Sequence, residues 1–169
     1  MLVNGRSSER QLFQFGIDGS NASVDDAEMS TKPSTTYKPK YLGHASREAI
    51  ETVDCIPWQG GPISVCLACS EFTSLCPITG QPDFGEIIVR YTPRDFIIET
   101  KSMKLFLMNY RDRGVFNEAL VDEMADALYR QIKPHQIEIT GRFHSRGGIA
   151  ITVTAQRPDG EFHGNKTDG

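Results

Sequence analysis

Residues 71–84 read EFTSLCPITGQPDF and stand between two apolar segments, residues 63–68 and 85–91, that have the length and composition of β-strands. Gly80 and Pro82 disfavour a regular helix within this stretch. The sequence therefore predicts two strands joined by a shaped loop, and we expect the remaining elements to be organised around this pair.

The loop holds one thiol, Cys76, and one acid, Asp83. Pro77 biases Cys76 toward an extended backbone, so the loop can hold the sulfur and the carboxyl at a fixed separation. A nucleophile paired with a proton donor needs such an arrangement. A buried cysteine beside a turn explains the same residues equally well. The loop alone therefore leaves catalysis and packing as two open interpretations.

Three segments have helical patterns. Residues 101–110 carry apolar side chains at positions i, i+3, i+4 and i+7, which predicts an amphipathic helix. Residues 116–132 repeat this pattern over a longer stretch, which Pro134 ends. Residues 44–53 are expected to form a short helix with Ser46 as its N-cap.

Further strands are predicted at residues 96–99, 136–143 and 149–155, the last two joined by a tight turn at Gly147 and Gly148. The order strand, strand, helix, helix, strand, strand indicates an α+β fold with two helices on one face of a four-stranded antiparallel sheet. Such a sheet has exposed edges, and pairing with copies of the same chain is one way to close them.

The length of 169 residues predicts one domain, at residues 41–157. The polar residues 1–40 are expected to be a flexible N-terminal tail, and residues 158–169 a loose C-terminal tail. The net charge of −4 argues against nucleic acid as a direct partner. No apolar run approaches the ~20 residues that span a bilayer, so we expect a cytoplasmic protein with no membrane partner.

The four cysteines fall within one short region, and a reducing compartment would keep them as thiols. Cys66 and Cys69 form a C-x-x-C pair, a spacing found in zinc and redox sites. A structural zinc site needs four ligands, and His135 and His144 lie on separate predicted elements. The pair is therefore interpreted as apolar filling of a strand, and no metal site is predicted.

The third candidate site is a scattered group of charged residues: Glu99, Lys101, Lys104, Glu118 and Arg146. Glu118 opens the second long helix, where the helix dipole by itself favours an acid. The cations can equally form a solvated face. Taken singly, each residue has a structural explanation that is at least as good as a functional one.

Four blocks stand in collinear order within residues 69–151: EFTSLCPITGQPDF, ETKSMKLFL, YRDRGVFNE and FHSRGGI. Together they resemble the QueF family, the single-module nitrile reductases of queuosine biosynthesis, whose substrate is 7-cyano-7-deazaguanine. The resemblance implies the tunnelling fold, or T-fold, that is shared with GTP cyclohydrolase I. In that fold, subunits close their sheets into a β-barrel and stack as rings, with active sites between subunits.

The resemblance also implies roles for the loop pair. Cys76 matches the nucleophile that adds to the nitrile carbon and forms a covalent thioimide, and Asp83 matches the proton donor to the nitrile nitrogen. A protonated thioimide is a better hydride acceptor than a nitrile, which explains the pairing. NADPH reduces the thioimide, and a second NADPH reduces the resulting imine to the amine.

Two sets of binding residues are implied by the same resemblance. The substrate-binding set contains the acid that recognises the deazaguanine edge, Glu118, and four other residues: Ile98, Glu99, Thr100 and Asn117. The cations that match NADPH-binding positions are Lys101, Lys104 and Arg146. The chain has no G-x-G-x-x-G motif, so a Rossmann domain would not bind the cofactor.

Two positions depart from the family pattern. Thr100 stands where Ser or Leu is usual, which is a mild change because a hydroxyl is retained. Asn117 stands where the family usually has His, and asparagine cannot titrate near neutral pH. This change bears on the rate, the pH profile and the reaction itself.

The leading hypothesis is an NADPH-dependent reductase that converts 7-cyano-7-deazaguanine to 7-aminomethyl-7-deazaguanine. One alternative is a related amidinotransferase, in which ammonia displaces the sulfur of the same thioimide on tRNA; Asn117 favours it, whereas the retained cations argue against it. Another alternative is a non-catalytic barrel that binds a purine-like ligand or serves as a structural subunit. A zinc-dependent cyclohydrolase is a third, and it would need zinc at Cys66 or Cys69.

Overall fold

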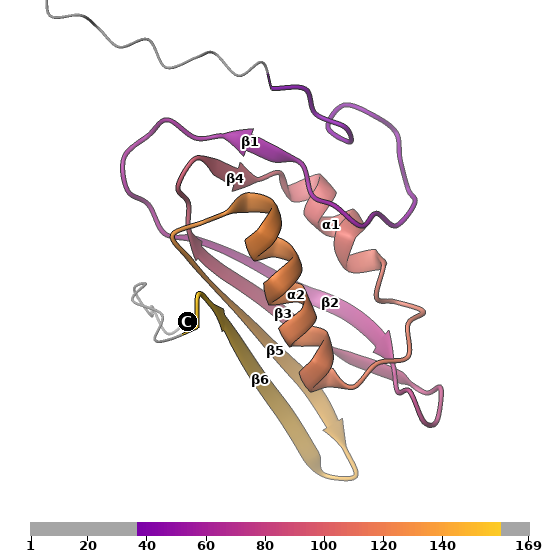
Figure 1. The fold of residues 1–169 in the computed structure, drawn as a ribbon. Helices are drawn as coiled ribbons and strands as arrows, with labels where there is room; N and C mark the ends of the chain where they lie inside the picture. The colour runs from indigo at the N-terminus through magenta and orange to yellow at the C-terminus, as the bar shows by residue number, and fades with distance from the viewer. Residues whose placement is uncertain (1–36, 160–169) are drawn as a thin grey trace, which may run out of the picture. The chain divides into compact units, whose positions relative to one another are not determined.

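The computed structural model describes residues 37–159, so most of the tails expected at residues 1–40 and 158–169 lies outside the described residues. Figure 1 shows the arrangement of the helices and strands. In chain order they are β1 (Cys55–Pro57), β2 (Val65–Leu75), β3 (Pro82–Thr92), β4 (Phe96–Ile98), α1 (Thr100–Met108), α2 (Asn117–Ile132), β5 (Gln136–Arg146) and β6 (Ile149–Arg157).

Four strands form an antiparallel sheet in the order β2-β3-β5-β6. The register places Val89 of β3 opposite Ile139 of β5, and side chains alternate along each strand, so odd-numbered residues of both strands share one face. These residues are apolar and buried, among them Ile87 and Phe143. The α+β class with an antiparallel sheet, predicted from the sequence, is confirmed.

Both helices pack on this apolar face (Figure 1). Val121 of α2 lies over Gly141 of β5, where an added Cβ atom would come within 2.7 Å of a Val121 methyl group. Only glycine allows the helix to approach the strand this closely. Leu107 of α1 faces the other half of the sheet and lines the same groove as Ile87 of β3.

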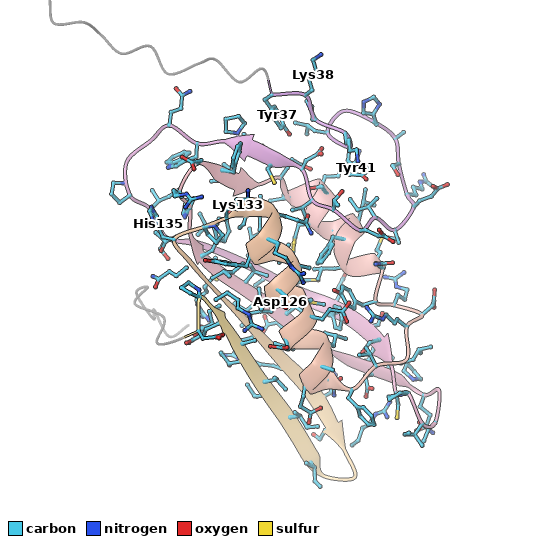
Figure 2. The ribbon with its side chains drawn as sticks, in the orientation of Figure 1. Tyr37, Lys38, Tyr41, Asp126, Lys133 and His135 are labelled. Atoms are coloured by element: carbon cyan, nitrogen blue, oxygen red, sulfur yellow. The ribbon has the colours of Figure 1, made fainter. Side chains whose placement is uncertain are left out.

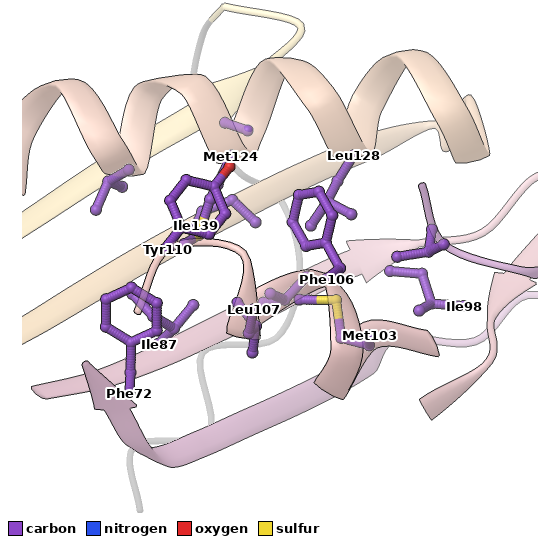
Figure 3. Packing of buried hydrophobic residues seen from close by; sticks show 14 of the residues in the cluster. Phe72, Ile87, Ile98, Met103, Phe106, Leu107, Tyr110, Met124, Leu128 and Ile139 are labelled. Carbon is purple, nitrogen blue, oxygen red and sulfur yellow. The ribbon is translucent and has the colours of Figure 1, made fainter. Parts of the chain in front are cut away.

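An aromatic cluster fills the space between α1 and the sheet (Figure 3). The rings of Phe106 and Tyr110 lie 5.7 Å apart, and Phe72 of β2 lies 6.3 Å from Tyr110 and 6.4 Å from Phe143 of β5. Burying each such side chain contributes about 2 kcal/mol to stability. The cluster therefore fixes the last turn of α1 against the end of β2 that leads to Cys76.

The strands extend further than the sequence predicts. β2 continues to Leu75 and β3 begins at Pro82, so the loop between them contains residues 76–81 alone. Proline is tolerated at the first residue of a strand, where it removes no ladder hydrogen bond. The pairing of Ser74 with Asp83 across the two strands then sets the geometry of the loop.

The short helix expected at residues 44–53 is wrong. Residues 45–54 form no helix or strand, and backbone groups there bond to distant elements: Ile50 N–H donates to Leu105 O, and Val53 N–H donates to Gln131 Oε1. A ten-residue helix is marginal by itself, so these tertiary bonds override its capping signal.

A strand that the sequence did not predict follows this segment. β1 pairs with β4 as a separate two-stranded sheet, with Cys55 opposite Ile98. The backbone N–H of Ile98 also donates to the hydroxyl of Tyr91, at 2.9 Å, which ties β4 to β3. Three residues are too few for a hydrophobic period to be visible.

Between residues 37 and 159, neither helix is long and apolar enough to cross a membrane.

Candidate active site

Cys76 is held in a closed loop directly after β2. Its backbone N–H donates to Gln81 O at 2.8 Å, and Gly80 N–H donates back to Cys76 O at 2.9 Å. Gly80 has a φ of +66°, which glycine adopts without strain. The predicted Thr-Gly turn therefore fixes the position of the sulfur.

The surroundings of Cys76 favour its thiolate. Its side chain is half-buried, and its pKa is lowered to about 7. The hydroxyl of Thr79 is the largest cause, followed by the backbone N–H groups of Thr79 and Ile78; the positive charge of Arg146 adds to them. The lowered pKa raises the thiolate fraction of Cys76 at neutral pH above that of an ordinary cysteine, which favours a nucleophile.

Asp83 lies at the start of β3 and is buried, with a residue exposure of 9%. Arg146 Nε is 2.9 Å from Asp83 Oδ1, and the same guanidinium donates to the carbonyl of Pro82. The structure thus joins two residues that the sequence predicts for different roles, a proton donor and a cofactor-binding cation.

Two buried polar atoms near this pair lack hydrogen-bond partners within the described residues. Ser74 is fully buried and lies opposite Asp83 across the β2–β3 ladder, yet its Oγ bonds to nothing. The Oδ1 atom of Asn117 is also buried and unpaired. Buried polar atoms in proteins are almost always hydrogen-bonded, so each is available to a ligand or water.

Sequence reasoning missed Ser74. The available signal was its position two residues before Cys76, which in an extended strand puts both side chains on the same face.

The loop between α1 and α2 holds the start of α2 close to the Cys76 loop. Leu75 N–H donates to Arg113 O and Val115 N–H donates to Leu75 O, both at 3.1 Å. A Cβ atom on Gly114 would come 3.3 Å from Pro77 Cα. This contact anchors the start of α2 beside the Cys76 loop, with Glu118 exposed in its first turn.

We call this part of the molecule the cysteine end: Cys76, Asp83, Asn117, Glu118 and Arg146. In Figure 1 the loop after β2, the start of α2 and the β5–β6 hairpin lie at the lower end of the sheet.

The other predicted site residues lie at the opposite end, which we call the lysine end: Ile98, Glu99, Thr100, Lys101 and Lys104. Tyr91, which bonds to Ile98, is eight residues along β3 from Asp83. At ~3.3 Å per residue, the two ends are roughly 26 Å apart within one chain.

Glu99 is buried and caps α1. Its carboxylate accepts the backbone N–H groups of Lys101 at 2.8 Å and Ser102 at 2.7 Å. These bonds satisfy two of the amide donors that a helix start leaves free. Glu99 therefore has a structural role that the sequence did not predict.

Lys101 is held by the chain before β1. Its Nζ donates to Tyr41 O at 2.9 Å and to His44 O, and Figure 2 shows Tyr41 beside the start of α1. Asp54 holds the same segment, accepting the backbone N–H groups of Lys40, Tyr41 and Leu42. The ammonium is thus already bonded within the chain.

A groove of about 530 Å³ runs between α1 and β2. It is lined by apolar side chains, including Leu67 and Met103, and carries two cations, Lys104 and Arg111. Neither cation has a side-chain partner within the described residues. Cys76 and Asp83 do not line this groove, so it is separate from the nucleophile.

The two cysteines of the C-x-x-C pair lie on opposite faces of β2. Cys66 pairs with Arg90 and Cys69 with Ile87, so the two side chains point to opposite faces of the sheet. The two sulfurs cannot bind one metal ion together. No cluster of three or more metal-ligating side chains occurs between residues 37 and 159.

The family model described as QueF-like protein matches residues 82–161. The NADPH-dependent 7-cyano-7-deazaguanine reductase of Anaeromyxobacter dehalogenans (strain 2CP-C) is 45% identical over 107 residues, which is 62% of this chain and 88% of that protein. The chain belongs to the QueF family.

Other comparisons agree with this assignment to the QueF family. The reductase of the same name from Helicobacter pylori (strain P12) is 47% identical over 102 residues, covering 60% of this chain and 69% of that protein. The crystal structure of the archaeosine synthase QueF-Like in the apo form matches with a TM-score of 0.51 and 21% identity. It covers 59% of this chain and 95% of that one, and at this identity it supports the fold alone.

Proposed function

We propose that this protein is an NADPH-dependent reductase that converts 7-cyano-7-deazaguanine to 7-aminomethyl-7-deazaguanine in queuosine biosynthesis. The observation that carries the proposal is a thiol with a pKa of about 7, Cys76, at the same end of the sheet as a buried carboxyl, Asp83. Relatives that share 44–52% identity with this chain are named for this reaction.

The first step is addition of the Cys76 sulfur to the nitrile carbon. A carbon–sulfur bond forms, one π bond of the nitrile breaks, and its electron pair moves to nitrogen. The thiol proton ends on that nitrogen through Asp83, so the thioimide forms with no net gain or loss of protons. A buried, oriented carboxyl suits this transfer because it stays at one distance from the reacting atoms.

Two molecules of NADPH, bound in turn, would each supply one hydride: one for the thioimide carbon, and one for the imine that remains after the sulfur leaves. The Cys76 thiolate is a good leaving group for the same reason that it is a good nucleophile, namely its lowered pKa. Each reduction also takes up one proton at nitrogen, and we propose Asp83 as the acid that delivers it.

The groove between α1 and β2 fits a phosphate-bearing cofactor. Lys104 and Arg111 are exposed cations at its wall, and Arg and Lys both suit phosphate oxygens. Lys104 is therefore proposed to hold NADPH with Arg111, which the sequence did not single out. Lys101 stays a prediction, because Tyr41 O and His44 O occupy its ammonium.

A complete site needs both ends of the molecule. Glu118 and Asn117 are proposed to bind the deazaguanine edge at the cysteine end, and the strand end at Ile98, Glu99 and Thr100 to complete the pocket. Because these groups are roughly 26 Å apart in one chain, two copies would have to place a cysteine end against a lysine end. We propose the T-fold assembly for this purpose, with sheets closed into a barrel and stacked rings.

The sheet face away from the helices supports closure into a barrel. It is polar and internally paired: Arg90 lies 3.7 Å from Glu138, and Gln156 Nε2 donates to Glu138 at 2.7 Å. A polar face suits a water-filled lumen. The four cysteines, all free thiols, fit a reducing compartment, and we propose the cytoplasm.

The test is turnover of the pure protein with 7-cyano-7-deazaguanine and NADPH, followed by the loss of NADPH absorbance. Two equivalents of NADPH should disappear per nitrile, and Cys76→Ala should consume none. Absence of oxidation in the parent chain would reject reduction.

One observation favours the amidinotransferase as the second candidate. Asn117, at the start of α2, stands where the family usually has a titratable histidine, and its Oδ1 has no partner within residues 37–159, so it can accept a hydrogen bond from ammonia or an amide. In that case the thioimide forms, NADPH is not oxidised, and added ammonia releases the amidine.

A further inference from the structure

Arg146 makes its contacts at the nucleophile and not at the groove proposed for NADPH. Its Nε lies 2.9 Å from Asp83 Oδ1, and its guanidinium also donates to Pro82 O. One side chain thus holds two consecutive residues at the start of β3. Among residues 37–159, Arg146 is the sole ion-pair partner of Asp83.

The backbone of β5 is adapted to this contact. The β5–β6 register shifts by one residue between Phe143 and Arg146, directly before the turn at Gly147 and Gly148. A bulge of this kind re-aims a side chain, because one extra residue moves it to the other face of the strand. Without the shift, Arg146 would share the open, polar face with Arg142; with it, Arg146 reaches Asp83.

Arg142 provides an internal comparison on the same strand. It pairs with Glu86 at 3.6 Å, and both side chains are well exposed, at 57% and 32%. The Asp83 side chain is 12% exposed, whereas that of Arg146 is 41% exposed. A buried carboxylate depends on its partner much more than an exposed one does, because water cannot replace the lost interaction.

We propose that Arg146 is a positioning residue for nitrile addition, holding the Asp83 carboxyl in place at the cysteine end and offsetting negative charge there. The inference rests on the proposed function, and it departs from the cofactor role that the family resemblance implies for this arginine. The guanidinium stays protonated throughout, so it neither donates nor accepts a proton in the addition step. Its charge also contributes to the lowered pKa of Cys76.

The experiment measures adduct formation without NADPH, so a role in cofactor binding cannot affect it. The parent chain, Arg146→Ala, Arg146→Lys and the control Arg142→Ala are mixed with 7-cyano-7-deazaguanine, quenched at set times, and analysed by intact-protein mass spectrometry. We expect Arg146→Ala to form the thioimide about 10- to 100-fold more slowly, Arg146→Lys to be intermediate, and Arg142→Ala to stay within about twofold. Millimolar guanidinium chloride should restore part of the Arg146→Ala rate, and sodium chloride at the same concentration should not.

Adduct formation by Arg146→Ala at the parent rate, together with a raised KM for NADPH, would overturn the proposal. Arg146 would then be assigned to NADPH binding. Thermal melting shows whether each variant folds; should Arg146→Ala fail to do so, Arg146→Lys carries the comparison. A parent chain that forms no adduct means that the proposed function has failed. The positioning role is then read from iodoacetamide labelling of Cys76 at pH 7, where Arg146→Ala should react about twofold more slowly than Arg142→Ala and equal rates would refute it.

Discussion

The cysteine end and the lysine end of the sheet carry similar residue types, but the chain satisfies their polar groups differently. At the lysine end, Glu99 caps α1 and Lys101 bonds to two backbone carbonyls. At the cysteine end, Asn117 Oδ1 is buried without a partner among residues 37–159, as is Ser74 Oγ opposite Asp83, and Glu118 is exposed.

This difference separates groups that the fold uses from groups that it leaves for a ligand. Glu99 and Lys101 at the lysine end contribute to stability through these bonds, so their substitution should lower stability as well as activity. Cys76, Asn117 and Glu118 at the cysteine end contribute little to the fold, so their substitution should change activity alone. The following predictions test this contrast.

The largest effect is expected for Cys76→Ala at the cysteine end. The variant should lose at least about a thousandfold in kcat, because no other thiol lies in the loop. Its melting temperature should match that of the parent, since the loop is closed by backbone hydrogen bonds that the substitution keeps. Activity and thermal melting of the same preparation check both statements. A large fall in stability would show that the sulfur is a packing residue.

Substitution of Glu99 should affect stability, whereas substitution of Glu118 should affect substrate binding. Glu99→Ala removes a buried cap that accepts two backbone N–H groups, which should lower the free energy of unfolding by about 2 kcal/mol, or ~30-fold in the folding equilibrium. Glu118→Gln should change it by less than about 0.5 kcal/mol and raise the KM for the nitrile. Urea denaturation measures the free energy of unfolding of both variants, and steady-state kinetics measures their KM for the nitrile. Equal stability losses would erase the contrast between the ends.

The two lysines of α1 give a similar comparison with a smaller effect. Lys104→Met should raise the KM for NADPH about tenfold and leave the melting temperature unchanged, because Lys104 lines the groove as an exposed cation. Lys101→Met should lower the free energy of unfolding by about 1 kcal/mol through loss of its bonds to Tyr41 O and His44 O. The idea fails if Lys101→Met raises the KM for NADPH while stability stays at the parent value.

The smallest effect concerns the pH dependence of Cys76. Hydrogen bonds to the sulfur favour the charged thiolate, so removing the hydroxyl in Thr79→Val should raise the pKa of Cys76 above about 7. Labelling with iodoacetamide across pH measures this directly, and the rate at pH 7 should fall about threefold in the variant. An unchanged profile would mean that the backbone N–H groups alone stabilise the thiolate.

Much of the fold was predictable because its elements are long and amphipathic. The period of residues 116–132 gave α2 to within one residue, and the alternation after Pro134 gave β5 and β6. The helix at residues 44–53 was wrong because capping and propensity are weak signals, and tertiary hydrogen bonds to α1 and α2 override them. β1 was missed because it is short and depends on β4 for pairing.

The candidate site was predictable in its residue types but not in its grouping. Cys76 and Asp83 stand at the two sides of one short loop, so their position at the same end of the sheet followed from the sequence. The contact of Arg146 with Asp83 depends on a bulge near the end of β5, and the bonds of Lys101 depend on the path of residues 41–44. Both are long-range features that no local pattern encodes. The distance between the two ends likewise could not be predicted, because it depends on how far β3 extends.

The most direct test of the central claim is intact-protein mass spectrometry of the chain incubated with 7-cyano-7-deazaguanine, with and without NADPH. Without NADPH, the account predicts an adduct on Cys76 with the full mass of the nitrile, since addition expels nothing. With NADPH, the adduct should disappear and the free amine should accumulate. A protein that stays at its unmodified mass under both conditions would contradict the claim that Cys76 attacks the nitrile.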